Sequence, residues 1–261
     1  MDILDTAFDA DRFFALLAAS EERLLMLDYD GTLAPFTPDR DRAVPWPGVP
    51  ELIDRLIDGN GSRVVIVTGR GVDALLSLLG TVRRPEIWGS HGWERLRADG
   101  GYEPPDLPPA ARLGLDEAAL LAGESAGEER IERKPAGIAL HWRGLGRRAV
   151  DRLRKAVEPA WRDLAARRGL RVHPFDGGIE IRPTGRDKGT AVSTLLAETP
   201  GAVACYLGDD LTDEDAFEAI GERGAGILVG TAARPTAASA RIRPPGELLG
   251  FLQRWIESTE G

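Results

Sequence analysis

The sequence predicts an α/β fold: a doubly wound parallel sheet with a smaller α/β domain inserted into it. Short apolar segments alternate with stretches of helical periodicity, as in parallel sheets that helices cover on both faces. Several apolar segments end at a polar residue, where such sheets bind ligands. This alternation of apolar and helical segments is interrupted between about residues 103 and 182. We therefore expect a larger domain of residues 1–104 and 183–261, interrupted by an inserted domain of residues 105–182.

Continuous apolar runs mark the strands of the larger domain. A strand that is buried on both faces shows no alternation, because neither face meets water. The first run stops at Asp28 and the second at Thr68. The predicted strands are 24–27, 64–67, 87–88 and 202–207. Between them, helices are predicted at 49–58, 72–79 and 188–198.

The inserted segment has a different pattern. Prolines 104, 105, 108 and 109 mark a linker, because clustered prolines favour loops. A hairpin is expected next, from 130–134 and 138–143. Apolar residues then repeat at helical spacing from Val150 to Leu164, with a kink or interruption expected at Pro159, since proline lacks the N–H that a helix needs. Two further strands are predicted at 170–173 and 179–182.

The formal net charge of −9 limits the partners of the protein. Nucleic acids and anionic membranes require a basic surface that offsets phosphate charge, so neither is expected as a partner. A small anionic substrate remains compatible with this charge if a metal ion or a few placed cations reverse the local field. We therefore expect a small-molecule partner and a monomeric protein.

The cysteine content and the N-terminal segment indicate in which cellular compartment the protein is expected. The single cysteine, Cys205, excludes a disulfide within the chain and suits a reducing environment. The segment 1–20 carries four aspartates and lacks the basic start of a signal peptide. Apolar runs stay shorter than the ~18 residues of a membrane span. A cytoplasmic location is expected.

The most informative motif is Asp28-Tyr29-Asp30-Gly31-Thr32. Side chains two positions apart on an extended chain point the same way, so two carboxylates are expected to face one pocket. One carboxylate can attack phosphorus while the other protonates the leaving alkoxide and later activates water. The alternative is that both acids only cap the turn after the strand.

Two further positions suit a phosphoryl group. The Thr68 hydroxyl and nearby N–H groups follow the second strand and can bind phosphoryl oxygens; alternatively, Thr68 caps a helix and Arg70 forms a surface ion pair. Lys188 stands at the start of a helix, where the macrodipole favours anions over cations. A bound phosphoryl group would explain this position, and a solvated surface lysine is the alternative.

An acidic run, from Gly208 to Asp215, follows the last predicted strand of the sheet. Carboxylate oxygens are the ligands that a hard cation such as Mg²⁺ accepts. Thr212 and Asp215 have the spacing of a capping box, and acids suit the first turn of a helix. These structural roles leave Asp209 and Asp210 unexplained, and of the two we predict that Asp209 binds a metal ion.

Together, these motifs in this order resemble the haloacid dehalogenase superfamily, and the insert resembles the cap domain of its sugar phosphatases. Within that superfamily the chain resembles the trehalose-6-phosphate phosphatase family. The motifs that carry this second resemblance are Gly89-Ser90-His91-Gly92, Glu132-Arg133-Lys134, Ala139-Leu140-His141-Trp142-Arg143, Glu180-Ile181-Arg182-Pro183 and the acidic run from Gly208.

The resemblance implies a reaction of trehalose biosynthesis: hydrolysis of trehalose-6-phosphate to trehalose and inorganic phosphate. It implies Asp28 as the nucleophile, which becomes a phospho-aspartate, and Asp30 as the general acid/base. Thr68 and Lys188 would bind the phosphoryl group. Mg²⁺ would be held by the Asp28 carboxylate, the Asp30 carbonyl and Asp209, with Asp213 in support.

The resemblance also implies a set of substrate-binding residues: His91, Lys134, Arg143, Glu180 and Arg182. Alternation of Glu180 and Arg182 would equally suit the polar face of an exposed strand. His141 lies between two apolar residues and is expected to be a packed core histidine.

Two other functions fit the same motifs. A signalling receiver domain also places a phosphorylatable aspartate, a hydroxyl and a lysine at strand ends, which would make Asp28 a switch. Asp30 argues against a switch, because an acid/base beside a phosphoryl group speeds its loss. Within enzymes, the alternative substrate is another sugar phosphate, of the sucrose-phosphate or mannosylglycerate-phosphate type.

Overall fold

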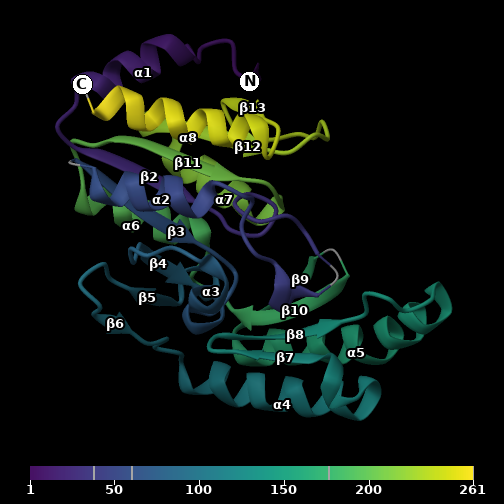
Figure 1. Ribbon diagram of the computed structural model, residues 1–261. Coiled ribbons are helices and arrows are strands. Elements are labelled where there is room, and N and C mark those ends of the chain that lie inside the picture. Colours follow the sequence, from purple (N-terminus) through teal and green to yellow (C-terminus); the bar gives the residue numbers. More distant parts are fainter. Residues whose placement is uncertain (38, 60, 176, 261) are drawn as a thin grey trace. The chain divides into compact units, whose positions relative to one another are not determined.

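The computed structural model describes residues 1–37, 39–59, 61–175 and 177–260. Within it the chain divides into two compact units (Figure 1). The larger unit consists of Met1–Glu103 and Asp187–Gly261, and the smaller unit of Pro104–Arg186. The smaller unit is thus one continuous insertion in the chain of the larger one.

A nine-stranded sheet forms the centre of the larger unit. The pairings from β13 through β4 are parallel, and those at the two edges are antiparallel. The predicted α/β fold with a parallel sheet is therefore confirmed. The order across the sheet is β1 (Asp2–Ile3), β13 (Ala240–Ile242), β12 (Gly224–Val229), β11 (Val203–Gly208), β2 (Arg23–Leu27), β3 (Ser62–Val67), β4 (Glu86–Gly89), β5 (Glu94–Leu96) and β6 (Tyr102–Glu103).

Helices cover both faces of this sheet, which is why its central strands read as continuous apolar runs. Leu25 and Leu27 of β2 pack in one core and Leu24 and Met26 in another, because alternate side chains of a strand point to opposite faces. The first core includes residues of α1 (Ala10–Ala19), α2 (Val49–Asp58), α3 (Val72–Leu79) and α8 (Gly246–Thr259). The second includes residues of α6 (Lys188–Glu198) and α7 (Glu214–Ile220).

Predicted elements of the larger unit agree closely with the observed ones. The three helices predicted at 49–58, 72–79 and 188–198 have those bounds, and each predicted strand is present with ends that shift by one or two residues. Cys205 is fully buried in the sheet, and burial raises the pKa of its thiol. None of the described helices is long and apolar enough to cross a membrane.

The described residues of the smaller unit form a four-stranded antiparallel sheet with two α-helices. Strands run in the order β7 (Ile131–Lys134), β8 (Gly137–His141), β10 (Gly178–Pro183) and β9 (Leu170–Phe175). The helices are α4 (Pro109–Ala126) and α5 (Arg147–Arg168), which pack together (Figure 1). The Trp161 indole N–H of α5 donates a hydrogen bond to the Ala118 carbonyl of α4 at 3.0 Å. Leu140 and Ile179 are opposite each other in this sheet and both are buried.

The expected interruption at Pro159 is wrong, because α5 continues without a break from Arg147 to Arg168. A proline inside a helix costs about 3 kcal/mol, since it removes a hydrogen bond and crowds the preceding turn. Pro159 is exposed, whereas Val157, Trp161 and Leu164 are buried. Burial of each such side chain contributes about 1.5–3 kcal/mol, so packing of the helix outweighs the proline.

Candidate active site

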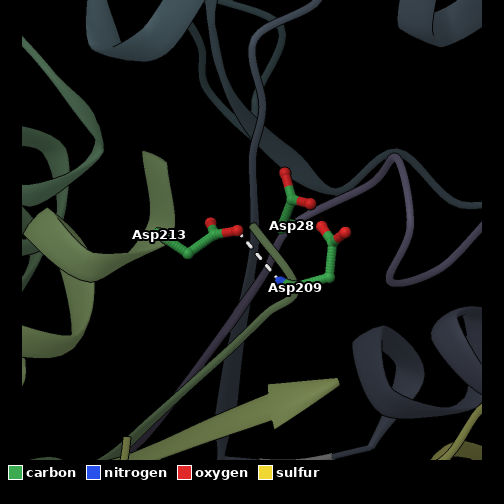
Figure 2. Close-up of side chains that lie close together, drawn as sticks. All are labelled: Asp28, Asp209 and Asp213. Carbon is green, nitrogen blue, oxygen red and sulfur yellow. Dashed lines mark hydrogen bonds between the residues drawn. The ribbon is translucent and has the colours of Figure 1, made fainter. Parts of the chain in front are cut away.

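Strands β11, β2 and β3 are neighbours in the sheet, so the residues that follow them meet at one edge. Asp28 follows β2, and its backbone N–H donates to the Leu207 carbonyl of β11 at 2.8 Å. The Asp28 side chain is buried. Figure 2 shows its carboxylate beside that of Asp209, which follows β11, with Asp213 next to them. Asp28 and Asp209, which are 181 positions apart in the chain, are thus brought together by strand pairing.

Asp28, Asp209 and Asp213 each place one carboxylate oxygen within 4.8 Å of the others. Desolvation raises the pKa of Asp28 to about 8, and Asp213 adds to this effect while Lys188 opposes it. The pKa of Asp209 rises to about 10, first through desolvation and then through the charge of Asp28. Buried carboxylates that repel one another are stabilised by a cation, and hard cations prefer oxygen ligands. The donor set therefore fits Mg²⁺.

Lys188 is the cation of this cluster. Its ammonium donates to Asp28 Oδ1 at 2.6 Å and to Asp213 Oδ1 at 2.7 Å. Burial alone would lower the pKa of this ammonium, but Asp213 and Asp28 outweigh burial and raise it. Lys188 is the first residue of α6, which is capped by the Asp187 side chain. It is buried, so it is not a solvated surface lysine.

Asp213 organises the acidic run. Its Oδ1 accepts hydrogen bonds from Lys188 and from the Tyr206 hydroxyl. Its Oδ2 accepts from the backbone N–H groups of Asp209 and Asp210, both at 3.0 Å. The capping box of the short helix η4 (Leu211–Asp213) consists of Asp210 and Asp213. The expected pairing of Thr212 with Asp215 as the box is therefore wrong.

Gly31 allows Asp209 to approach the first motif. Gly31 has a φ of +84°, and a Cβ atom at this position would lie 2.1 Å from Asp209 Oδ2. Only glycine combines this left-handed conformation with so close an approach. Replacement of Gly31 would therefore displace the Asp209 carboxylate from its present position.

Thr68 and His91 lie together in the larger unit. Thr68 follows β3, and its hydroxyl oxygen accepts a hydrogen bond from the Arg70 N–H at 3.1 Å. His91 lies in the short helix η2 (Ser90–Gly92), and its backbone N–H donates to the Thr68 carbonyl at 2.9 Å. Ser90 and His91 have φ values of +49° and +55°, which is costly for residues with a Cβ atom. Such strain often accompanies functional sites.

Asp30 is placed differently from Asp28. Arg70 binds its carboxylate through two hydrogen bonds, from Nε to Oδ2 and from Nη2 to Oδ1, both at 2.7 Å. The Asp30 carboxylate is not among the three gathered acids of the described chain. Arg70 is largely buried, with 11% of its side chain exposed. Arg70 is therefore part of the candidate site rather than a surface residue.

Sequence reasoning missed Arg234. Its Nη2 donates to the Asp210 carbonyl at 2.8 Å and to the Asp209 carbonyl at 3.4 Å. Its other terminal nitrogen, Nη1, pairs with Glu214. Arg234 thereby stabilises the backbone conformation of the acidic run. No motif surrounds it in the sequence, so only the fold reveals this contact.

In the smaller unit, three of the predicted substrate residues gather around Gly137. Lys134 and Glu180 form an ion pair at 3.0 Å. A Cβ atom on Gly137 would lie 2.8 Å from Glu180 Oε1 and 3.6 Å from the Cβ of Arg182. Arg143 lies at the other end of β10, where its Nε would be 3.0 Å from a Cβ atom on Gly177. Lys134, Glu180 and Arg182 are thus brought together, and Arg143 is apart from them.

His141 is not the packed core residue that its neighbours suggested. Its side chain is 31% exposed and its Nε2 lies 3.0 Å from Glu132 Oε2. The imidazole also meets the Phe175 ring edge to face, with centroids 5.3 Å apart. Cross-strand register places Glu132, Ala139 and Glu180 on one face of the sheet. That face is polar, and Ile179 and Ile181 belong to the opposite, apolar face.

Comparisons with known proteins find phosphatases that are similar to this chain. The family model described as trehalose-phosphatase matches residues 26–244. The chain is 32% identical over 244 residues to the trehalose-phosphate phosphatase of Mycobacterium marinum, and the match covers 88% of this chain and 60% of that protein. The chain thus spans about 60% of the length of the first curated relatives it matches.

Two solved structures are similar over almost their whole length. The C-terminal domain of C. albicans trehalose-6-phosphate phosphatase has a TM-score of 0.81 at 22% identity, covering 98% of this chain and 99% of that chain. A trehalose-6-phosphate phosphatase related protein has a TM-score of 0.72 at 26% identity, covering 90% and 97%. The first likeness concerns the fold alone.

Proposed function

Because this chain belongs to the trehalose-phosphatase family, we propose that it is a phosphoric monoester hydrolase that converts trehalose-6-phosphate into trehalose and inorganic phosphate. The observation that carries the proposal is the buried cluster in which Lys188 contacts Asp28 and Asp213, with Asp209 beside them. A nucleophile, a cation and oxygen ligands for a metal are then within reach of one phosphoryl group.

Asp28 is the proposed nucleophile. Its carboxylate attacks phosphorus, the bond from phosphorus to the sugar oxygen breaks, and Asp30 gives a proton to that oxygen. Water then attacks the phospho-aspartate and passes a proton to Asp30, which releases inorganic phosphate and restores the Asp28 carboxylate. Both half-reactions balance without an external reactant other than water.

The proposed Mg²⁺ site consists of the Asp28 carboxylate, the Asp30 carbonyl and Asp209, with Asp213 in support. When bound, Mg²⁺ supplies positive charge that offsets repulsion between the phosphoryl group and the acidic cluster. The raised pKa values of Asp28 and Asp209 support this proposal. Asp213, held by Lys188 and two backbone N–H groups, keeps the acidic run in place.

Thr68 and Lys188 are the proposed phosphoryl-binding residues. The Thr68 oxygen already accepts a hydrogen bond from the Arg70 N–H, so its hydroxyl hydrogen can be donated to a phosphoryl oxygen. The Lys188 ammonium has three donor hydrogens, and Asp28 and Asp213 account for two of them. A third remains for the phosphoryl group.

Sugar recognition is the proposed task of the smaller unit. His91, in the larger unit, is a further proposed substrate-binding residue. Lys134, Glu180 and Arg182 offer charged donors and acceptors on one sheet, and Arg143 lies beside Gly177 at the end of β10. Carboxylates and guanidinium groups form strong hydrogen bonds with sugar hydroxyls. The charge and composition of the chain also lead us to propose a cytoplasmic monomer whose partner is this small molecule.

A phosphate-release screen tests the proposed function. Trehalose-6-phosphate, sucrose phosphate and mannosylglycerate phosphate are compared, with Mg²⁺ and with excess chelator. We expect steady release from trehalose-6-phosphate that requires Mg²⁺. Faster release from another sugar phosphate would move the assignment to that substrate. A stable phosphorylated protein that releases no phosphate would instead favour the signalling switch.

A further inference from the structure

The ion pair between Asp30 and Arg70 has the geometry of a fixed fork. Two parallel hydrogen bonds of 2.7 Å join the guanidinium to both carboxylate oxygens. Such bidentate pairs restrict the orientation of a carboxylate much more than a single contact does. With 11% of the Arg70 side chain and 33% of the Asp30 side chain exposed, solvent competes little for the guanidinium.

Arg70 is itself held by its neighbours. Its guanidinium carbon lies 5.5 Å from the centroid of the Tyr29 ring, and the Tyr29 hydroxyl donates to the Ala43 carbonyl at 2.7 Å. The backbone N–H of Arg70 donates to the Thr68 hydroxyl oxygen, and the Arg70 carbonyl accepts from the Ser90 N–H at 2.8 Å. A fixed arginine therefore determines where the Asp30 carboxylate lies.

We propose that Arg70 is a positioning residue for Asp30, which rests on the proposed function in which Asp30 is the general acid/base. Asp30 follows the turn at Tyr29, and its carboxylate is separate from the buried acidic cluster. Without the guanidinium fork, this partly exposed side chain would sample other rotamers. Proton transfer needs a donor within hydrogen-bond reach of the reacting oxygen, so loss of Arg70 slows the step that Asp30 serves.

Proton balance is compatible with this pairing. Asp30 takes up the proton that attacking water releases while Arg70 holds its carboxyl group in place. The same proton goes to the sugar oxygen of the next substrate molecule. Arg70 neither gains nor loses a proton in this sequence, so its contribution is orientation.

Two substrates whose leaving groups differ in their need for a proton distinguish a positioning role of Arg70 from a purely structural one. A sugar alkoxide needs a proton as it leaves, whereas p-nitrophenolate is stable without one. We measure kcat and KM of the Mg²⁺-loaded protein on trehalose-6-phosphate and on p-nitrophenyl phosphate. The variants are Arg70→Met, Arg70→Lys, Asp30→Asn and the double variant Arg70→Met/Asp30→Asn. Arg83→Met is the matched control, because Arg83 forms an exposed pair with Asp58 at 2.7 Å.

Arg70→Met is expected to lower kcat/KM on trehalose-6-phosphate about 100-fold, as loss of acid–base catalysis does. On p-nitrophenyl phosphate its kcat/KM should change by less than about threefold, because kcat/KM reports the step in which the leaving group departs and not the later attack of water, which Asp30 serves for both substrates. Arg70→Lys keeps the charge without the fork and should fall between Arg70→Met and wild type. The double variant should be no slower than Asp30→Asn, since both changes affect one step. Arg83→Met should behave as wild type.

Equal losses of kcat/KM on both substrates would overturn the positioning role. So would a double variant whose kcat/KM on trehalose-6-phosphate is lower than that of Asp30→Asn by the full Arg70 factor. Circular dichroism shows whether each variant folds, and Arg70→Lys decides the question if Arg70→Met does not. Asp28→Asn is run beside these variants. If Asp28→Asn stays active, the proposed function itself fails; if it is inactive while Arg70→Met slows both substrates equally, only the role of Arg70 fails.

Discussion

Lys188 and Asp28, which are 160 positions apart in the chain, form a buried ion pair with an Nζ–Oδ1 distance of 2.6 Å. The pair connects the start of α6 to the end of β2. Lys188 also contacts Asp213 at 2.7 Å, so one ammonium serves two carboxylates. Removal of this ammonium would leave like charges buried together.

Lys188→Met is therefore expected to destabilise the protein and to abolish turnover. Breaking a buried ion pair from one side costs about 3–5 kcal/mol, because the remaining charge loses its partner. Urea unfolding measures this loss. Addition of Asp213→Asn should recover part of the stability but not the activity. Lys155→Met, on the exposed surface of α5, is the control. Equal stability of Lys188→Met and wild type would contradict the buried pair.

Asp209→Asn should stabilise the metal-free protein while removing its response to Mg²⁺. The folded-state pKa of Asp209 is raised to about 10, so folding loses stability as pH rises from the ordinary aspartate range towards that value. Asparagine does not ionise, and the variant should show a weaker fall in Tm between pH 5 and pH 8. Thermal unfolding with Mg²⁺ or with chelator measures both effects. A Tm increase by Mg²⁺ as large as in wild type would refute Asp209 as a ligand.

Protonation of Glu198, far from the candidate site, is expected to lower the stability of the fold in acid. Hydrogen bonds from Arg95 lower its pKa to about 2, and Arg63 adds to the effect. The ionised form therefore stabilises the fold at pH values above the ordinary glutamate pKa, and this stabilisation disappears as pH falls towards 2. Glu198→Gln should cost about 1–2 kcal/mol at neutral pH, a value reduced by solvent screening. Urea unfolding at neutral pH and near pH 3 should show the difference shrinking; an unchanged difference would contradict it.

Glu180 should matter for the sugar and not for phosphoryl transfer. Its loss would leave sugar hydroxyls unpaired, which costs about 1–3 kcal/mol, or roughly ten- to a hundredfold in kcat/KM. Glu180→Ala is expected to weaken kcat/KM for trehalose-6-phosphate by that factor while an aryl phosphate is hydrolysed nearly as before. The exposed Glu129, changed to alanine, is the control. Equal losses on both substrates would indicate a structural role, and no loss would remove Glu180 from the recognition site.

Patterns that depend on local burial could be predicted from the sequence. Strand β2 is apolar throughout and ends at Asp28 because both of its faces pack against helices. Helix α4 was not predicted, since its apolar residues do not form one buried stripe: Leu113 and Leu120 are 58% and 65% exposed. Helix α5 continues through Pro159, where the sequence predicted a kink or interruption, because tertiary packing outweighs the local cost of the proline.

Contacts between distant segments could be predicted only in part. Strand order brings Asp28 and Asp209 together, and the position of each after an apolar strand indicated a shared edge. The fork between Asp30 and Arg70 and the contact of Arg234 with the Asp210 carbonyl depend on side-chain reach across loops. Neither leaves a periodic or compositional signal in the sequence.

Phosphorylation of Asp28 during turnover is the central claim, and acid quenching tests it most directly. Wild type and Asp28→Asn are mixed with radiolabelled trehalose-6-phosphate and Mg²⁺, quenched in acid and treated with hydroxylamine, which cleaves acyl phosphates. Wild type should carry an acid-stable label that hydroxylamine removes. Asp28→Asn should fold, carry no label and lose nearly all turnover. Label on Asp28→Asn, or turnover within about tenfold of wild type, would contradict the account.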